Sequence, residues 1–168
     1  VIRVEPINRI QPFSRGGDSQ VTKEQAEAMG KAGTPTGMYP GFDPGHDRWN
    51  RNAGFNAHSR NKRSMACDFN TPEGREAFIR LLKVSDAFIE NNVPVTINKA
   101  GLDWDVVKEI NPRLIMLRMP AFGLSGPYGN FRAFGTHVEG MIGHHLIRGY
   151  PEAGPDYTGE AFTADAMA

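Results

Sequence analysis

The sequence predicts an α/β fold, in which a parallel sheet is flanked by helices. Short apolar segments alternate with segments of helical hydrophobic period, and residues that cap helices stand between them. This alternation is typical of βαβ units, whose crossovers are right-handed. We expect four strands, near Val1–Glu5, Ser64–Asp68, Asp86–Glu90 and Leu114–Met119.

A long excursion separates the first two strands. Gly, Pro, Asn and Asp crowd together between about residues 7 and 56, which predicts a surface loop. One short helix is expected within it, at Thr22–Met29. The chain begins inside a strand and stops at Asp165–Ala168, where a helix is starting, so we expect residues 1–168 to be part of a larger domain. The alternative is a natural short protein with frayed ends.

Capping residues define the helices of the second half. Thr71–Glu73 is typical of a helix start, and an apolar stripe at three- and four-residue spacing follows it. Asp103 is expected to cap a further helix, which Asn111–Pro112 ends. We also expect a short turn at Ile97–Leu102 and a helix at Thr136–Ile147.

Composition argues against several classes of protein. Nineteen Lys and Arg balance nineteen Asp and Glu, so no net charge draws the chain to nucleic acid or to an anionic membrane. No apolar run approaches the length of a membrane span. The single cysteine, Cys67, excludes an internal disulfide and favours a reducing, cytoplasmic location.

Three polar motifs have competing interpretations. Asn61–Ser64 brings two cations to the start of a strand, where they could neutralise phosphates, although such residues more often form a solvated turn. Glu90–Asn92 ends a strand, at the edge where open parallel sheets bind ligands, but Asn is also a common turn residue. The loop Pro120–Tyr128 combines glycines, a hydroxyl and two aromatic rings, and it fits a ligand-binding loop or an ordinary turn.

Metal sites and hydrolase sites are not expected. The five histidines form no recognised ligand spacing with one another, with Cys67 or with a carboxylate. Ser125 is one residue short of a Gly-x-Ser-x-Gly elbow, and Cys67 has no catalytic partner nearby in the sequence.

Asp165 is the carboxylate best placed for covalent chemistry. It lies among small and apolar residues at an expected helix start, where backbone amides and the helix dipole would keep it ionised. Carboxylates serve as nucleophiles in covalent catalysis. On these residues alone, however, a plain helix cap is the favoured interpretation.

Six segments of the chain stand in one order and at compatible spacing: Val1–Pro6, Asn61–Ser64, Thr71–Glu76, Asp86–Asn91, Asn111–Ile115 and Gly123–Tyr128. In that order they resemble the class III CoA-transferases, the family of the formyl-CoA and carnitine CoA-transferases. The resemblance covers residues 1–6 and about 50–168, and Asp165 stands where the family has its catalytic aspartate.

The resemblance implies a Rossmann-like parallel sheet flanked by helices. It identifies residues 1–168 as part of the large domain of such an enzyme, with the excursion at about 7–56 within it. It also implies an interlocked homodimer in the intact enzyme. It implies no prosthetic group, because coenzyme A and acyl-CoA are substrates. The residues that match or replace the family's CoA contacts are Cys67, Asn70, Asn91, Asn92, Lys99 and Arg132.

Some positions depart from the family pattern. Lys99 replaces an arginine that contacts CoA phosphates, and it keeps the charge. Asn92 replaces a phenylalanine, which removes a stacking group. The family's Gly-Tyr-Asp reads Ala133–Gly135 here, so an accessory acid is missing; His137 and Glu139, a turn further along, could replace it.

The implied reaction transfers CoA from an acyl-CoA thioester to a carboxylic acid acceptor, through a covalent intermediate on Asp165. Two alternatives remain open. An acyl-CoA racemase of the same superfamily would need a histidine where Phe134 stands, three residues before His137. A non-catalytic CoA- or nucleotide-binding fragment would need no such group.

Overall fold

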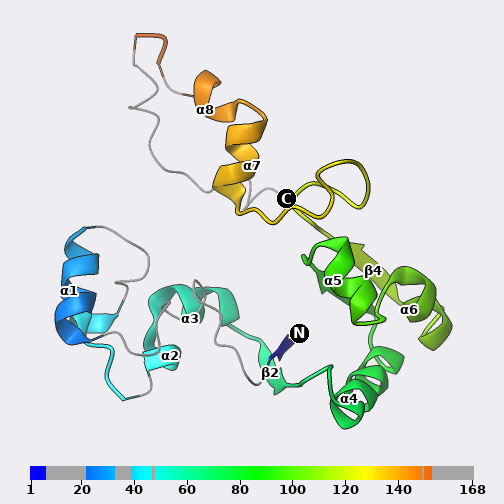
Figure 1. Cartoon of the computed structure of the whole chain (residues 1–168). Coiled ribbons are helices and arrows are strands. Elements are labelled where there is room, and N and C mark those ends of the chain that lie inside the picture. The colour runs from blue at the N-terminus through cyan, green and yellow to red at the C-terminus, as the bar shows by residue number, and fades with distance from the viewer. Residues whose placement is uncertain (7–21, 33–38, 47, 149, 153–168) are drawn as a thin grey trace. The chain divides into compact units, whose positions relative to one another are not determined.

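The computed structural model describes residues 1–6, 22–32, 39–46, 48–148 and 150–152. They belong to two compact units, Val1–Ala77 and Phe78–Ala168 (Figure 1). In each unit two strands pair in parallel and helices connect them, which confirms the α/β prediction. Among the described residues, no helix combines the length and the apolar character needed to cross a membrane.

The first unit is built on one pair of strands. β1 (Ile2–Glu5) runs parallel to β2 (Arg63–Ala66), and Ile2 lies opposite Arg63. The long excursion therefore connects two strands that are neighbours in space. Its described helical segments are α1 (Lys23–Lys31), η2 (Pro40–Phe42), α2 (Arg48–Arg51) and α3 (Ala53–Ser59).

The excursion is more helical than the sequence predicts. The prediction of one short helix is right for α1, which a capping box starts: Thr22 Oγ1 accepts from Gln25 N, and Gln25 Oε1 accepts from Thr22 N. It misses α2 and α3, and in the case of α3 the reason is that Asn52 caps a helix instead of continuing a loop. Its Oδ1 accepts a hydrogen bond from Phe55 N at 2.9 Å.

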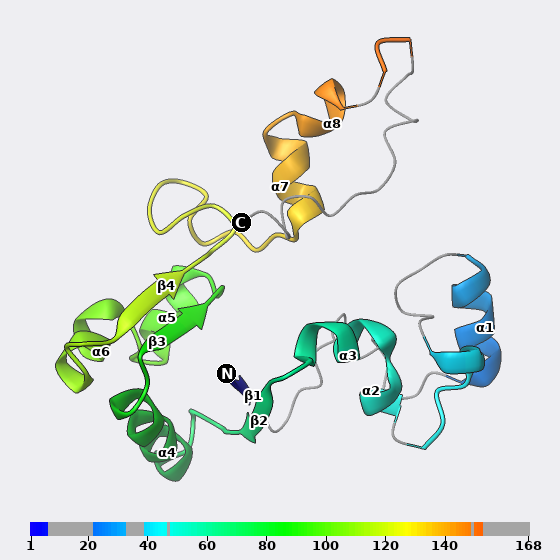
Figure 2. The ribbon, with the colours of Figure 1, turned by 180° about the vertical axis from the view of Figure 1, so that it is seen from behind.

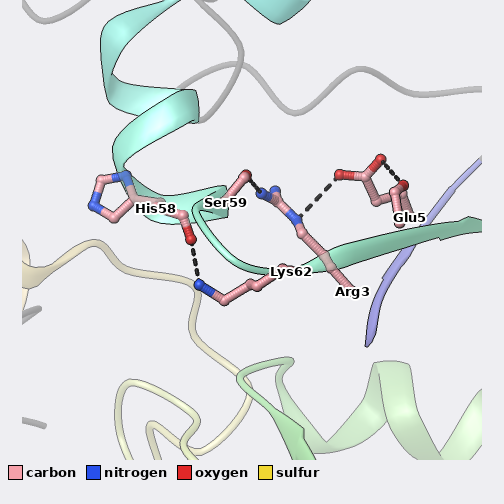
Figure 3. Close-up of polar contacts among 6 residues, drawn as sticks. Arg3, Glu5, His58, Ser59 and Lys62 are labelled. Atoms are coloured by element: carbon pink, nitrogen blue, oxygen red, sulfur yellow. Dashed lines mark hydrogen bonds and ion pairs between the residues drawn. The ribbon is translucent and has the colours of Figure 1, made fainter. Parts of the chain in front are cut away.

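Arg3 links β1 to α3. Its guanidinium donates to the Ser59 hydroxyl (Nη1 to Oγ, 2.8 Å) and pairs with the Glu5 carboxylate (Nε to Oε1, 3.2 Å), as Figure 3 shows. It also lies 5.3 Å from the centroid of the Phe55 ring. Ser64 on β2 donates to the other carboxylate oxygen of Glu5 at 2.9 Å. One network of charges therefore joins both strands to the helix that precedes β2.

Helix α4 (Pro72–Lys83) begins where the sequence predicts. Thr71 Oγ1 accepts from Gly74 N at 3.1 Å and so caps the first turn. A Cβ on Gly74 would come within 2.0 Å of the backbone oxygen of Asp68. The Gly74 carbonyl accepts a hydrogen bond from the Cys67 thiol at 3.0 Å. The loop after β2 and the first turn of α4 therefore leave no space for a side chain at position 74.

The second unit repeats the strand pairing. β3 (Ala87–Glu90) runs parallel to β4 (Ile115–Arg118), as Figure 2 shows. Glu90 lies opposite Arg118 at the carboxyl ends of both strands. The crossover holds two helices, and the described residues after β4 form two more. These helices are α5 (Pro94–Lys99), α6 (Trp104–Ile110), α7 (Gly135–Met141) and α8 (His144–Ile147).

The end of α4 is attached to this pair of strands. Phe78 packs edge-on against Phe88 of β3, with ring centroids 5.6 Å apart. Asn111, which follows α6, donates through Nδ2 to the carbonyl oxygens of Leu82 and Ser85 at 2.9 and 3.0 Å. The residue that the sequence identifies as a helix stop therefore also binds two carbonyl oxygens at and just beyond the end of α4.

Two of the expected boundaries in this unit are wrong. The turn expected at Ile97–Leu102 begins as α5, which runs to Lys99. The single helix expected at Thr136–Ile147 is divided into α7 and α8, because Gly143 takes a left-handed backbone conformation with φ of 74°. The Asp103 cap is confirmed, since its Oδ1 accepts from Val106 N at 3.2 Å.

Replacing Gly74 with alanine should destabilise the protein, because the new Cβ would overlap a backbone oxygen. We expect a loss of roughly 2–3 kcal/mol in the free energy of unfolding. The measurement is the midpoint of denaturant unfolding.

Gly140→Ala is the matched control. The nearest atom to its Cβ would be a His145 ring carbon at 3.8 Å, an ordinary contact, and alanine favours a helix interior. We expect this variant to unfold at the same or a higher midpoint. Equal midpoints for Gly74→Ala and the unchanged protein would contradict the close packing at Gly74.

Candidate functional site

A buried ion pair marks the carboxyl ends of β3 and β4. Arg118 Nε donates to Glu90 Oε1 at 2.8 Å, and the two side chains are 13% and 3% exposed. The strand register requires this contact, because Glu90 and Arg118 are directly opposite each other. Ligands of open parallel sheets bind at this edge, so the pair lies at the base of a candidate site.

The second carboxylate oxygen of Glu90 shapes the loop after β3. Glu90 Oε2 accepts a hydrogen bond from Asn92 N at 2.7 Å. The loop therefore turns immediately after the strand, and both Asn91 and Asn92 are exposed. Their side-chain amides are therefore open to solvent at this edge, and their role in binding a ligand stays a prediction.

Helix α5 and the loop after β4 meet at one hydrogen bond. Val95 N, in the first turn of α5, donates to Asn130 Oδ1 at 3.2 Å. Lys99 lies at the other end of α5, and Arg132 lies two residues beyond Asn130; both are exposed. Neither cation forms an ion pair within the described part of the chain. The second unit thus presents two uncommitted positive charges on segments that touch.

The loop after β4 is held by turns and aromatic contacts. Tyr128 lies between two other rings, with centroids 6.3 Å from Phe122 and 5.4 Å from Phe131. Gly123 and Gly126 have φ of 81° and 96°, where a side chain would be strained. The glycines of this motif are therefore required by the turns themselves, and the loop has one defined path.

In the first unit, Cys67 and Asn70 follow the carboxyl end of β2. Cys67 is buried, and its thiol donates to the Gly74 carbonyl oxygen. Burial raises the pKa of this thiol, and the nearby Asp68 carboxylate adds to the effect. Asn70 is exposed, and its Nδ2 donates to Asp68 Oδ1 at 2.8 Å. A ligand at this edge could contact the Asn70 amide, whereas the Cys67 sulfur is turned into the protein.

Lys62 and Arg63 lie at the opposite end of the same strand. Arg63 begins β2 and Cys67 follows its end, which separates them by roughly 13 Å along the strand. Lys62 Nζ also donates to the backbone oxygen of His58 (Figure 3). The solvated-turn interpretation of this motif suits that position better than a phosphate contact shared with Cys67 and Asn70.

The two acidic candidates for the site are Asp165 and Glu139. Asp165 lies outside the described residues. Glu139 on α7 is 1% exposed, and its Oε2 is 3.2 Å from Arg148 Nη1 and 3.5 Å from His144 Nδ1. A carboxylate that is buried and paired in this way is poorly placed to act as an accessory acid.

His137 has a local structural role. Its Nδ1 accepts a hydrogen bond from Phe134 N at 3.2 Å, at the start of α7. The residues described by the structure contain no group of three His, Cys, Asp or Glu side chains that could hold a metal ion.

The sequence alone missed the Glu90–Arg118 pair and the Asn130 contact. A signal for the pair was present, since Glu90 ends one predicted strand, Arg118 is next to last in the following one, and the two residues carry opposite charges. Nothing near Val95 or Asn130 in the sequence indicates their contact, because 35 residues separate them.

Comparison with known proteins gives the chain a family context. A family profile described as CoA-transferase family III matches residues 33–168. The beta subunit of succinyl-CoA–L-malate CoA-transferase of Chloroflexus aurantiacus is 41% identical over 109 residues, which are 65% of this chain and 27% of the relative. Succinate–glutarate CoA-transferase of Agrobacterium fabrum is 37% identical over 107 residues, 64% of this chain and 27% of the relative.

A solved structure supports the fold. A CAIB/BAIF family protein from Brucella suis matches with a TM-score of 0.55 and 39% sequence identity, over 61% of this chain and 27% of that protein. The chain thus spans about a quarter of the length of the curated relatives it matches.

Cys67 should react slowly with thiol reagents in the folded protein, because burial shields it and its raised pKa lowers the thiolate fraction. At pH 8 we expect alkylation by iodoacetamide to be at least about tenfold slower than in denaturant. Mass spectrometry of the Cys67 peptide gives both rates. Equal rates in the two conditions would contradict the buried position.

Proposed function

The chain belongs to CoA-transferase family III, and from this membership we propose that the protein transfers CoA from an acyl-CoA thioester to a carboxylic acid. The observation that carries the proposal is the pair of exposed, uncommitted cations, Lys99 and Arg132, on touching segments beyond β3 and β4. CoA carries several phosphate charges, and these two cations would neutralise them.

The proposed CoA contacts divide by chemistry. Lys99 and Arg132 supply positive charge for phosphates. Asn91 and Asn92 supply exposed amides at the turn that Glu90 holds. Asn70 and the backbone around Cys67 would lie against the adenosine, as the family resemblance implies. Burial of the Cys67 sulfur limits that residue to shape and backbone contacts.

We further propose Asp165 as the covalent nucleophile. Its carboxylate attacks the thioester carbonyl, the C–S bond breaks, and an aspartyl–acyl anhydride and CoA thiolate result. The thiolate then attacks the aspartyl carbonyl, which forms an aspartyl-CoA thioester and releases the donor acid. The acceptor carboxylate attacks that thioester in turn, and the freed thiolate takes the acceptor acyl group, which regenerates Asp165.

Oxyanion charge develops at each acyl transfer in this sequence and must be stabilised. Backbone amides of the ordered Gly-rich loop, which includes Gly123 and Gly126, are candidates for that role. Water must also be excluded, because an anhydride hydrolyses readily.

The names of the relatives mention succinyl-CoA, L-malate, succinate and glutarate. For this chain the proposal stays with the class, an acyl-CoA donor and a carboxylic acid acceptor. The proposal also includes an interlocked homodimer, which the resemblance implies, and a cytoplasmic location, which the single cysteine favours. The racemase alternative gains no support, since His137 accepts a local backbone hydrogen bond at a helix start.

Asp165→Asn should abolish CoA exchange between two carboxylic acids. The amide nearly preserves shape but is a poor nucleophile, so we expect turnover to fall by at least about a thousandfold while CoA binding persists. The intact enzyme is incubated with acyl-CoA, trapped with hydroxylamine and digested.

Modification mapped to Asp165 in the unchanged enzyme, and absent from the variant, is the expected result. Full activity of Asp165→Asn, or trapping only at Glu139 or Glu160, would identify a different carboxylate as the nucleophile.

Lys99→Ala should weaken CoA binding, because it removes a charge-assisted contact to phosphate. We expect the KM for acyl-CoA to rise roughly tenfold with little change in kcat. Lys108→Ala on α6 is the matched control, since that lysine pairs with Asp105 at 2.7 Å on an exposed helix face. An unchanged KM in Lys99→Ala would remove this residue from the proposed site.

A further inference from the structure

Asn130 supplies a helix cap that the local sequence cannot. The residue before α5 is Val93, whose side chain has no hydrogen-bonding atom, and Pro94 at the helix start has no N–H. Val95 N is therefore the first free donor of α5, and a donor in this position needs a partner from outside the helix. Asn130 provides that partner through Oδ1 at 3.2 Å, from 35 residues further along the chain.

We propose that Asn130 is a positioning residue for CoA, which sets the distance between the cations Lys99 and Arg132; this inference rests on the proposed function. Lys99 ends the helix whose first turn Asn130 caps, and Arg132 follows Asn130 by two residues. One hydrogen bond thus ties the segment that carries each charge to the segment that carries the other.

Other hydrogen bonds of the second unit fix the strand ends and the loop on either side of Asn130. At the carboxyl ends of β3 and β4, the Glu90 carboxylate accepts from Arg118 Nε, and Met119 N donates to Glu90 O at 2.9 Å. On either side of Asn130, Gly129 N donates to Gly126 O and Phe131 N donates to Tyr128 O, at 3.2 and 2.8 Å. The loop therefore passes from the sheet to Arg132 through closed turns, and Asn130 is the point where it is anchored to α5.

A fixed distance between the cations matters because CoA presents phosphate groups at defined separations. When the loop is held in place, a ligand meets both charges without first ordering the chain. Without the Asn130 bond, Lys99 and Arg132 remain charged and exposed but must be brought into place by binding. The loss should therefore appear in CoA affinity and leave the chemical step unaffected.

The test compares two helix-capping hydrogen bonds of equal length. Asn130→Ala removes the cap of α5, and Asp103→Ala removes the cap of α6, in which Asp103 Oδ1 accepts from Val106 N, also at 3.2 Å. The second cap is local and touches no proposed CoA contact. In the intact enzyme, kcat and the KM for acyl-CoA and for the acceptor acid are measured for both variants, together with Tm and direct binding of CoA by calorimetry.

We expect Asn130→Ala to raise the KM for acyl-CoA and the Kd for CoA roughly fivefold, with kcat and the acceptor KM within about twofold. Asp103→Ala should lower Tm and leave the Kd for CoA unchanged. An unchanged Kd in Asn130→Ala, or an equal rise in Asp103→Ala, would overturn the positioning role.

The outcome also separates this inference from the proposed function. If Lys99→Ala weakens CoA binding and Asn130→Ala does not, only the positioning role fails. If the unchanged enzyme binds CoA but exchanges none between acids, the transferase proposal fails, and the Kd comparison still decides the role of Asn130. If the unchanged enzyme binds no CoA, both fail.

Discussion

The pairing of Glu90 with Arg118 is the interaction on which the candidate site of the second unit depends. Both residues end their strands, and the parallel register places them side by side with their charged groups largely out of water. Removing one partner from such a pair is costly, because the other charge is left buried and uncompensated. The Glu90 carboxylate also accepts a hydrogen bond from the backbone N–H of Asn92. One side chain therefore fixes both the strand ends and the turn that follows β3.

Four cationic side chains of this unit differ in their burial and pairing. Arg118 and Arg148 are turned inward and pair with the buried carboxylates of Glu90 and Glu139. Lys99 and Arg132 are exposed and make no ion pair among the described residues. Internal pairing neutralises the charges that folding buries, which leaves the exposed cations available for a negatively charged ligand.

The sequence predicts those features whose cause is local. Thr71 and Asp103 cap helices three residues away, and the strands follow from short apolar runs. The prediction fails where the cause is distant. The sequence predicts a turn at Ile97–Leu102, whereas α5 runs to Lys99 and takes its cap from Asn130, beyond β4. Charge pairing across strands likewise needs a register that composition does not reveal.

The buried thiol of Cys67 has a consequence for redox chemistry. A protein that handles CoA works beside a free thiol whenever that thiol is released, and an accessible cysteine nearby would form a mixed disulfide with it under oxidising conditions. Formation of that disulfide requires a cysteine that an attacking sulfur can reach, or one that is itself ionised. Burial keeps the Cys67 sulfur out of reach, and the raised pKa keeps it protonated, so both features protect the single sulfhydryl of this sequence from its proposed thiol substrate.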